Sequence, residues 1–128
     1  MIIAPLSTVV NWQREVLAWT ELDVVLYYGS QEDRKIARDY EFFFANQKKK
    51  GYKLEVVITT PETAATFDSR NSFRNSRELS KIHWGAIVVD EAHKMKNHES
   101  KFNTIIREEY TYHSCLLLTG TPLQNNIG

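Results

Sequence analysis

The chain has 128 residues, of which 42% are hydrophobic and 25% are charged, the makeup of one globular domain rather than a disordered or fibrous segment. Sixteen basic and sixteen acidic residues cancel, so no overall positive field draws in nucleic acid, and any such contact must come from local donors. No apolar run approaches the roughly twenty residues of a membrane span, and the start lacks the basic region of a signal peptide. We therefore expect an intracellular protein without a membrane partner.

Apolar runs alternate along the chain with longer amphipathic stretches. This is the pattern of parallel strands joined by crossover helices, and it predicts the α/β class. The predicted strands are residues 2–4, 24–28, 54–59, 86–90 and 115–118. Cys115, the single cysteine, lies in the last of these apolar runs without a disulfide partner, so we expect it to be buried and to serve packing.

The first predicted helix follows Pro5, and Ser7 or Thr8 would be its N-cap. Its apolar face would consist of Val10, Leu17 and either Val16 or Trp19. Trp12 and Trp19 are seven residues apart, which places both on one helical face and favours a role as core anchors.

A charged helix from 31 to about 45 follows Ser30 and ends at the Lys48-Lys49-Lys50-Gly51 run, a solvated helix end. Its apolar stripe would be Ile36, Tyr40 and either Phe43 or Phe44. Pro61 suits the first turn of a third helix, residues 67–80 are polar and without period, and residues 100–110 form the last helix. The segment 67–80 is predicted to be a surface insertion.

An acidic pair, Asp90 and Glu91, closes the apolar run 84–89. A carboxylate at a strand end costs desolvation unless a cation or a solvent-filled cleft receives it. Ligands of open α/β sheets bind beyond the carboxyl ends of the strands, and parallel-sheet ATPases use such a pair for magnesium and for the attacking water. A zinc site that uses His93 and His98 is disfavoured, because zinc-binding helices space their histidines four apart and these two are five apart.

Four strings stand in order along the chain: Ala4-Pro5-Leu6-Ser7-Thr8-Val9-Val10-Asn11-Trp12, Thr59-Thr60-Pro61-Glu62, Asp90-Glu91-Ala92-His93-Lys94-Met95-Lys96-Asn97 and Leu118-Thr119-Gly120-Thr121-Pro122-Leu123-Gln124-Asn125-Asn126. Together they resemble the first motor lobe of Swi/Snf-type chromatin-remodelling ATPases, in particular the chromodomain-helicase-DNA-binding (CHD) branch. The resemblance covers almost the whole chain and is weakest between residues 67 and 80. Its last string is highly specific, since RNA helicases with the same acidic box carry Ser-Ala-Thr in place of the Thr119-Gly120-Thr121 segment.

The resemblance implies a partial RecA-like parallel sheet flanked by helices, an incomplete helicase ATP-binding domain over residues 1–128, with ATP and Mg²⁺ as cofactors. Asp90 would hold magnesium through water, and Glu91 would orient and deprotonate the water that attacks the γ-phosphate. His93 would couple the nucleotide site to the Thr119-Gly120-Thr121 segment.

The resemblance also implies contacts to DNA. Ser7 and Thr8 would combine hydroxyl donors with a helix N-terminus to bind phosphate. Thr59 and Thr60 resemble a second strand-gripping motif, although Pro61 stands where the family usually has Tyr or Phe. The alternative for these two threonines is a simple helix cap.

The chain contains no Gly-x-x-x-x-Gly-Lys-Ser/Thr loop, whose backbone amides and lysine hold nucleotide phosphates. In the family this loop and its strand precede the part matching residues 2–4, and a second RecA-like lobe lies beyond Gly128. We therefore expect a fragment, inactive alone, of a nuclear ATP-dependent translocase that acts on double-stranded DNA and nucleosomes. The alternative is an ATPase-dead module that binds DNA phosphate or interferes with its relatives.

A consequence for the sheet follows from the missing strand. In related motors it neighbours the strand matching residues 115–118, so its absence would leave that edge uncovered. Uncovered apolar edges pair with other chains, and the chain alone should be poorly soluble or oligomeric.

Overall fold

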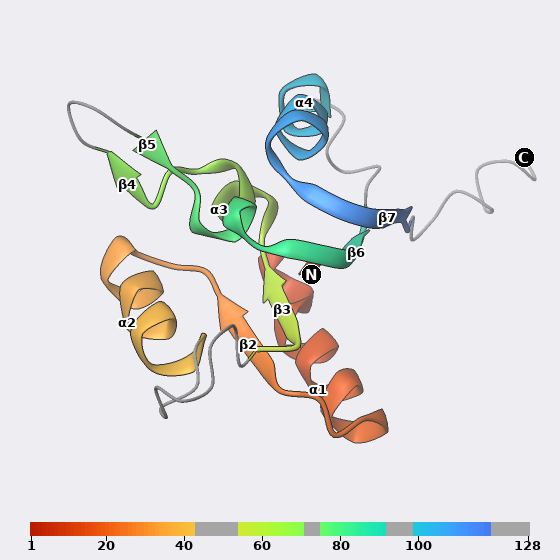
Figure 1. Cartoon of the computed structure of the whole chain (residues 1–128). Helices are drawn as coiled ribbons and strands as arrows, with labels where there is room; N and C mark the ends of the chain where they lie inside the picture. The colour runs from red at the N-terminus through yellow and green to blue at the C-terminus, as the bar shows by residue number, and fades with distance from the viewer. Residues whose placement is uncertain (43–53, 71–74, 92–98, 119–128) are drawn as a thin grey trace, which may run out of the picture.

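The computed structural model describes residues 1–42, 54–70, 75–91 and 99–118, which form an α/β domain around one parallel sheet (Figure 1). Five strands pair in the order β2-β3-β1-β6-β7, and β4 and β5 form a separate antiparallel pair. The strands are β1 (Ile2–Ile3), β2 (Val24–Tyr27), β3 (Val56–Thr59), β4 (Ser69–Arg70), β5 (Asn75–Ser76), β6 (His83–Val89) and β7 (Thr111–Leu117). The helices are η1 (Leu6–Thr8), α1 (Val9–Trp19), α2 (Gln31–Glu41), α3 (Pro61–Ala65), η2 (Glu78–Lys81) and α4 (Glu99–Glu109). The predicted class and the parallel sheet are confirmed.

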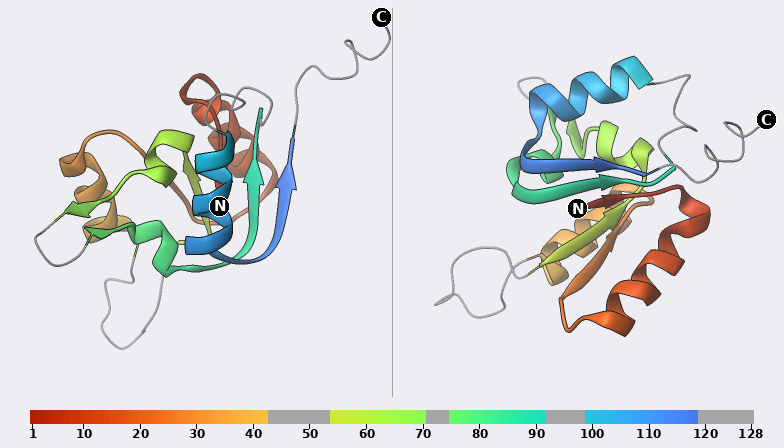
Figure 2. Two further views of the ribbon diagram at one scale, coloured as in Figure 1. Left: turned by 90° about the horizontal axis from the view of Figure 1, so that it is seen from above. Right: turned by 90° about the vertical axis from the view of Figure 1, so that its right-hand side faces the viewer.

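Helices cover both faces of the sheet. On one face α1 packs through Val9 against Ile2 of β1 and Ile58 of β3. On the opposite face α2, α3 and α4 enclose the larger core, to which α4 contributes Phe102 and Ile105. Figure 2 shows α1 and α4 on opposite sides of the strands. The helix that follows β1 and the helix that follows β6 therefore cover opposite faces of the sheet.

The predicted apolar face of α1 is wrong at Val10 and Leu17, and of its two alternatives Val16 packs against the sheet while Trp19 does not. Val10, Leu17 and Trp19 are 43%, 54% and 81% exposed, whereas Val9 is fully buried. After the turn η1 that follows Pro5, the side chain of Val9 faces the sheet. Successive residues of an α-helix are rotated by about 100° around its axis, so Trp12 and Val16 lie on the same face as Val9. Trp12 is thus packed as predicted, and Trp19 is not.

The N-cap residues of α1 and α2 are Thr8 and Ser30, and only Ser30 makes a side-chain capping bond. Thr8 occupies the N-cap position of α1 without a side-chain capping bond, and its hydroxyl donates to the Pro5 carbonyl at 3.0 Å. Ser30 caps α2, since its hydroxyl accepts from the Asp33 amide at 3.1 Å while the Asp33 carboxylate accepts from the Ser30 amide. This reciprocal pair is a capping box.

The predicted apolar stripe of α2 is also wrong. Ile36 and Tyr40 are 57% and 78% exposed, and the side chains turned inward are Arg34 and Ala37. The helix ends at Glu41, whereas the segment containing Phe43, Phe44 and the lysine run lies outside the described residues. The helix is rotated toward a buried carboxylate that belongs to a distant part of the chain.

That carboxylate is Asp68, at the start of the segment predicted to be a surface insertion. Its side chain is 3% exposed and accepts hydrogen bonds from Tyr27 Oη at 2.7 Å and Arg34 Nε at 2.8 Å. Leu79, near the end of the same segment, is 1% exposed. The prediction therefore fails at both ends of the segment, because a polar side chain can lie in a core when its hydrogen bonds are satisfied there.

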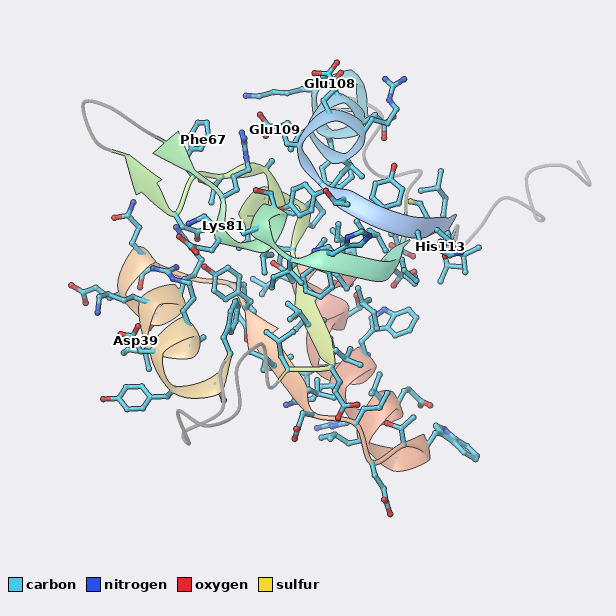
Figure 3. All side chains as sticks on the ribbon, in the orientation of Figure 1. Asp39, Phe67, Lys81, Glu108, Glu109 and His113 are labelled. Atoms are coloured by element: carbon cyan, nitrogen blue, oxygen red, sulfur yellow. The ribbon has the colours of Figure 1, made fainter. Side chains whose placement is uncertain are left out.

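Two more contacts attach this segment to the domain. The Arg77 guanidinium lies 4.0 Å from the centroid of the Phe67 ring, which Figure 3 labels, and its Nε donates to the Ala65 carbonyl at 3.1 Å. Arg77 also forms an ion pair with Glu109 at the end of α4.

The edge strand of the described sheet, β7, is exposed as predicted. Leu116 and Leu117 are 56% and 61% exposed. Cys115 is exposed too, which contradicts its predicted burial: it lies on this edge strand, where β6 is its one neighbour in the described sheet. Among the described helices, none is both long and apolar enough to cross a bilayer.

Candidate functional site at the carboxyl ends of the strands

The carboxyl ends of β1, β2, β3 and β6 converge on a cavity of about 720 Å³. Its walls combine backbone and side chains from each of these strand ends with the first turns of α3 and α4. The lining residues are Pro5, Leu6, Tyr28, Gly29, Thr60, Pro61, Glu62, Ala65, Asp90, Glu91, Lys101 and Phe102. Asp90 and Glu91, singled out from the sequence, therefore lie in a cavity large enough for a ligand.

The cavity lies where the connections of the sheet change direction. β1 and β6 are neighbours with Ile3 opposite Val89, and the helices that follow them lie on opposite faces. In open parallel sheets this arrangement opens a crevice just beyond the strand ends, and ligands bind there.

Asp90 is held at this crevice by two hydrogen bonds. Its backbone amide donates to the Ile3 carbonyl at 2.8 Å, which extends the pairing of β6 with β1 by one residue. Its carboxylate Oδ2 accepts the indole N–H of Trp12 at 2.8 Å. For the other oxygen, Oδ1, no hydrogen-bond partner is found among the described residues.

Glu91 has a backbone φ of 56°. This left-handed conformation is uncommon for a residue with a side chain and costs on the order of 1–2 kcal/mol. Such outliers gather at functional sites, where the surrounding structure holds them in place. Here the conformation turns the chain sharply after β6 and puts two acidic residues next to the cavity.

The predicted DNA-binding residues fall into two groups. Ser7 is exposed and Thr8 half-buried, and both stand before the first turn of α1, whose amides have no side-chain cap. Thr59 and Thr60 are 0% and 5% exposed. The Thr59 hydroxyl donates to the Tyr27 carbonyl at 2.5 Å.

Thr60 caps the short helix α3. Its hydroxyl accepts from the Thr63 amide at 3.2 Å and donates to Thr63 Oγ1 at 2.8 Å. The helix-cap alternative thus describes Thr60, and the DNA contact of Thr59 and Thr60 stays a prediction.

Among the described residues that line the cavity, Glu62, Asp90 and Glu91 are acidic and Lys101 is basic. The carbonyl of Gly29, another lining residue, accepts from Arg34 Nη1 at 2.6 Å, so the buried ionic network of α2 also holds this part of the cavity wall in place. An acidic cavity of this kind suits a cation better than a bare phosphate.

Other predicted site residues lie outside the described residues. These are His93 and the Thr119-Gly120-Thr121 segment, and His98 of the disfavoured zinc site lies outside them too. Within the part of the chain that the structure describes, no three His, Cys, Asp or Glu side chains gather as a metal cluster would.

Sequence reasoning missed the link between Trp12 and Asp90. Trp12 was expected to pack, and its ring does contact the α1 side of the sheet, but its N–H also reaches the carboxylate 78 residues away. A signal was available, because a buried indole needs an acceptor for its N–H. The acceptor could not be named without the fold.

The parallel sheet with helices on both faces and the acidic end of β6 define an α/β domain of the RecA-like type. The model of the SNF2-related domain matches residues 1–128, and the chain belongs to this family.

Relatives and a solved structure agree with this assignment. The chain is 40% identical to "Chromodomain-helicase-DNA-binding protein 6" of Rattus norvegicus and 41% identical to "Chromodomain-helicase-DNA-binding protein 7" of Homo sapiens, over 99% of this chain and 4% of each relative. The structure "Sulfolobus solfataricus SWI2/SNF2 ATPase core in complex with dsDNA" matches with a TM-score of 0.64 and 26% identity, over 98% of this chain and 22% of that chain. The chain thus spans a small part of each relative.

Proposed function

We propose that the chain is part of the first motor lobe of an ATP-dependent DNA translocase that remodels nucleosomes in the nucleus. The observation that carries the proposal is the position of Asp90 and Glu91 beside the cavity at the carboxyl ends of the strands. Family membership supports it, since SNF2 and CHD relatives match nearly the whole chain.

The residues fit a magnesium ion that accompanies ATP. Mg²⁺ prefers oxygen donors and in phosphoryl-transfer sites is held by one or two carboxylates together with phosphates and water. Asp90 offers Oδ1 for this purpose. When bound, Mg²⁺ neutralises negative charge that develops on the phosphates.

Glu91 would orient the attacking water and accept its proton. General-base catalysis requires the carboxylate within hydrogen-bonding reach of the water, and the left-handed turn at Glu91 sets where its side chain begins relative to Asp90. The phosphates themselves would need donors from outside these 128 residues, because the sequence has no Gly-x-x-x-x-Gly-Lys-Ser/Thr loop. A second RecA-like lobe would complete the site.

Double-stranded DNA would contact the start of α1. The first amides of this 11-residue helix have no side-chain cap, although the Val9 amide already donates to the Leu6 carbonyl of η1, and Ser7 adds an exposed hydroxyl. A phosphate at a helix N-terminus is stabilised by these amides and by the helix dipole. His93 and the Thr119-Gly120-Thr121 segment would couple the nucleotide to DNA, as the family resemblance implies.

A steady-state measurement on a longer version that includes the phosphate loop and the second lobe tests the roles of the acidic pair. Glu91→Gln should lower kcat by roughly 10²–10⁴-fold with little change in the KM for ATP, because general-base catalysis acts in the transition state. Asp90→Asn should raise the Mg²⁺ concentration needed for half-maximal rate.

Glu41→Gln, at the exposed end of α2, is the control and should hydrolyse ATP like the wild type. Equal rates for Glu91→Gln and Glu41→Gln would refute the assignment. Wild-type DNA binding without any hydrolysis would favour the ATPase-dead module instead.

A further inference from the structure

One contact joins the two faces of the candidate site. The indole N–H of Trp12, on α1, donates to Oδ2 of Asp90 at the end of β6, with a nitrogen-to-oxygen distance of 2.8 Å. Trp12 and Asp90 are 78 positions apart and both are partly buried. Partial burial strengthens such a bond, since water competes for the donor and acceptor less than at an exposed site.

The Trp12 ring is held independently of this bond. It packs against the apolar cluster that α1 forms with the sheet, in which Ala4, Val9 and Ile58 are fully buried. An indole N–H can only donate, so a ring fixed in this position presents one donor in one direction. The fixed ring therefore sets the orientation of the Asp90 carboxylate, and the carboxylate is not needed to hold the ring.

The other two tryptophans donate elsewhere. Trp19 reaches Glu15 on the same helix in an exposed contact at 3.1 Å, and Trp84 reaches the Leu79 backbone carbonyl at 3.0 Å. Among the described residues, Trp12 is the indole that donates to a carboxylate of another element.

We propose that Trp12 is a positioning residue for the metal site: it occupies Oδ2 of Asp90 and keeps Oδ1 turned toward the cavity for a divalent cation or its bound water. The proposal rests on the proposed function, because it takes Asp90 as the metal-binding carboxylate. It adds a specific role for a side chain that packing alone would not require to be tryptophan.

The expected size of the effect follows from rotamers. A side chain that is released from one staggered well distributes over about three, so the fraction with the competent orientation falls to about a third. The apparent dissociation constant rises by the inverse of that fraction. Loss of the Trp12 donor should therefore weaken divalent-cation binding at Asp90 about threefold.

Nuclear magnetic resonance of the 128-residue chain, at a concentration where light scattering shows a monomer, tests the bond directly. The three indole N–H groups give separate signals, and a carboxylate acceptor should place the Trp12 signal downfield. Asp90→Ala should move the Trp12 signal and leave the Trp84 signal in place. Added Mn²⁺ should broaden the Trp12 signal before that of Trp84, which lies at the opposite end of β6.

Trp12→Phe keeps an aromatic ring and removes the donor, and Trp19→Phe is the matched control on the same helix. The Mn²⁺ dissociation constant, measured by the water-proton relaxation rate, should rise about threefold in Trp12→Phe relative to Trp19→Phe. Equal dissociation constants for the two variants, or a Trp12 signal that does not respond to Asp90→Ala, would overturn the proposal. The Asp90→Ala result stands even if Trp12→Phe does not fold.

Failure of the proposed function gives a different result. If Asp90→Ala leaves Mn²⁺ binding unchanged, Asp90 is not the metal-binding carboxylate. Both the metal-binding role of Asp90 and the positioning role of Trp12 are then refuted. If Asp90→Ala weakens Mn²⁺ binding and Trp12→Phe does not, only the role of Trp12 falls.

Discussion

Removal of the Asp68 carboxylate should destabilise the domain far more than removal of the exposed carboxylate of Asp39 on α2. Asp68 accepts from Tyr27 Oη at 2.7 Å, Arg34 Nε at 2.8 Å and the Glu78 amide at 2.7 Å. Asp68→Ala would leave the Arg34 guanidinium, whose side chain is 7% exposed, without its charge partner. Breaking a buried pair in this way costs about 3–5 kcal/mol.

This cost is large relative to the stability of a small domain, which is about 5–15 kcal/mol. For a chain of this length, 1 kcal/mol corresponds to about 4 °C, so Asp68→Ala should lower Tm by roughly 12–20 °C. Asp39→Ala is the control. Asp39, which Figure 3 labels on α2, pairs with Lys35 at 2.8 Å in solvent, and this pair contributes about 0.3–0.5 kcal/mol.

Thermal and urea unfolding of both variants, followed by circular dichroism, gives the two values. Asp68→Asn should fall between them, because the amide oxygen still accepts hydrogen bonds but carries no charge. Equal stabilities of Asp68→Ala and Asp39→Ala would show that the buried network does not form. Asp68 and its segment, residues 67–80, would then not hold α2 and the part of the cavity wall at Gly29 in place.

Three further predictions address the strand end, the amino terminus and the DNA contact. Glu91 has a φ of 56°, so the variant Glu91→Gly should be more stable to urea than Glu91→Ala by about 1 kcal/mol. At Arg14, an exposed position within α1, Arg14→Ala should instead be more stable than Arg14→Gly. The same order of stability at both positions would refute the left-handed turn at Glu91. In the 128-residue chain, burial lowers the pKa of the Met1 amino group from 8.0 to about 6, so the unfolded chain binds more protons between these values, and the free energy of unfolding should rise from pH 6 to pH 8 by roughly 2 kcal/mol. N-terminal acetylation should abolish this rise, and an equal rise in the acetylated chain would assign it to other groups. Ser7→Ala should weaken binding of double-stranded DNA several-fold by fluorescence anisotropy at fixed salt, whereas Thr20→Ala, at the opposite end of α1, should not; equal effects would place the contact elsewhere.

The strands could be predicted because their signal is local. Runs such as Val56–Thr59 combine β-branched residues with flanking turns, and their burial on both faces does not depend on a particular partner. The acidic strand end was predicted for the same reason, since Asp90 and Glu91 follow β6 directly. Position along a strand is enough to place a residue at the edge of a parallel sheet.

Helix rotation could not be predicted, since contacts far along the chain decide it. α2 turns Arg34 inward because Asp68 lies 34 residues further on, and no apolar periodicity records such an ion pair. α1 turns Val9 inward because of the η1 turn before it, which hydropathy does not describe. The bond between Trp12 and Asp90 has the same character.

The burial of Cys115 was mispredicted for a related reason. Its apolar sequence neighbours suggested a central strand, but burial depends on where the strand lies in the sheet. A strand with one neighbour exposes residues that a central strand would cover.

ATP hydrolysis with and without double-stranded DNA tests the central claim most directly. The 128-residue chain is measured beside a longer version that includes the phosphate loop and the second lobe, each as wild type and as Glu91→Gln. We predict that, of these four proteins, only the longer wild type hydrolyses ATP and that DNA increases its rate. Hydrolysis by the 128-residue chain that Glu91→Gln abolishes, or a longer version whose rate ignores both DNA and Glu91→Gln, would contradict it.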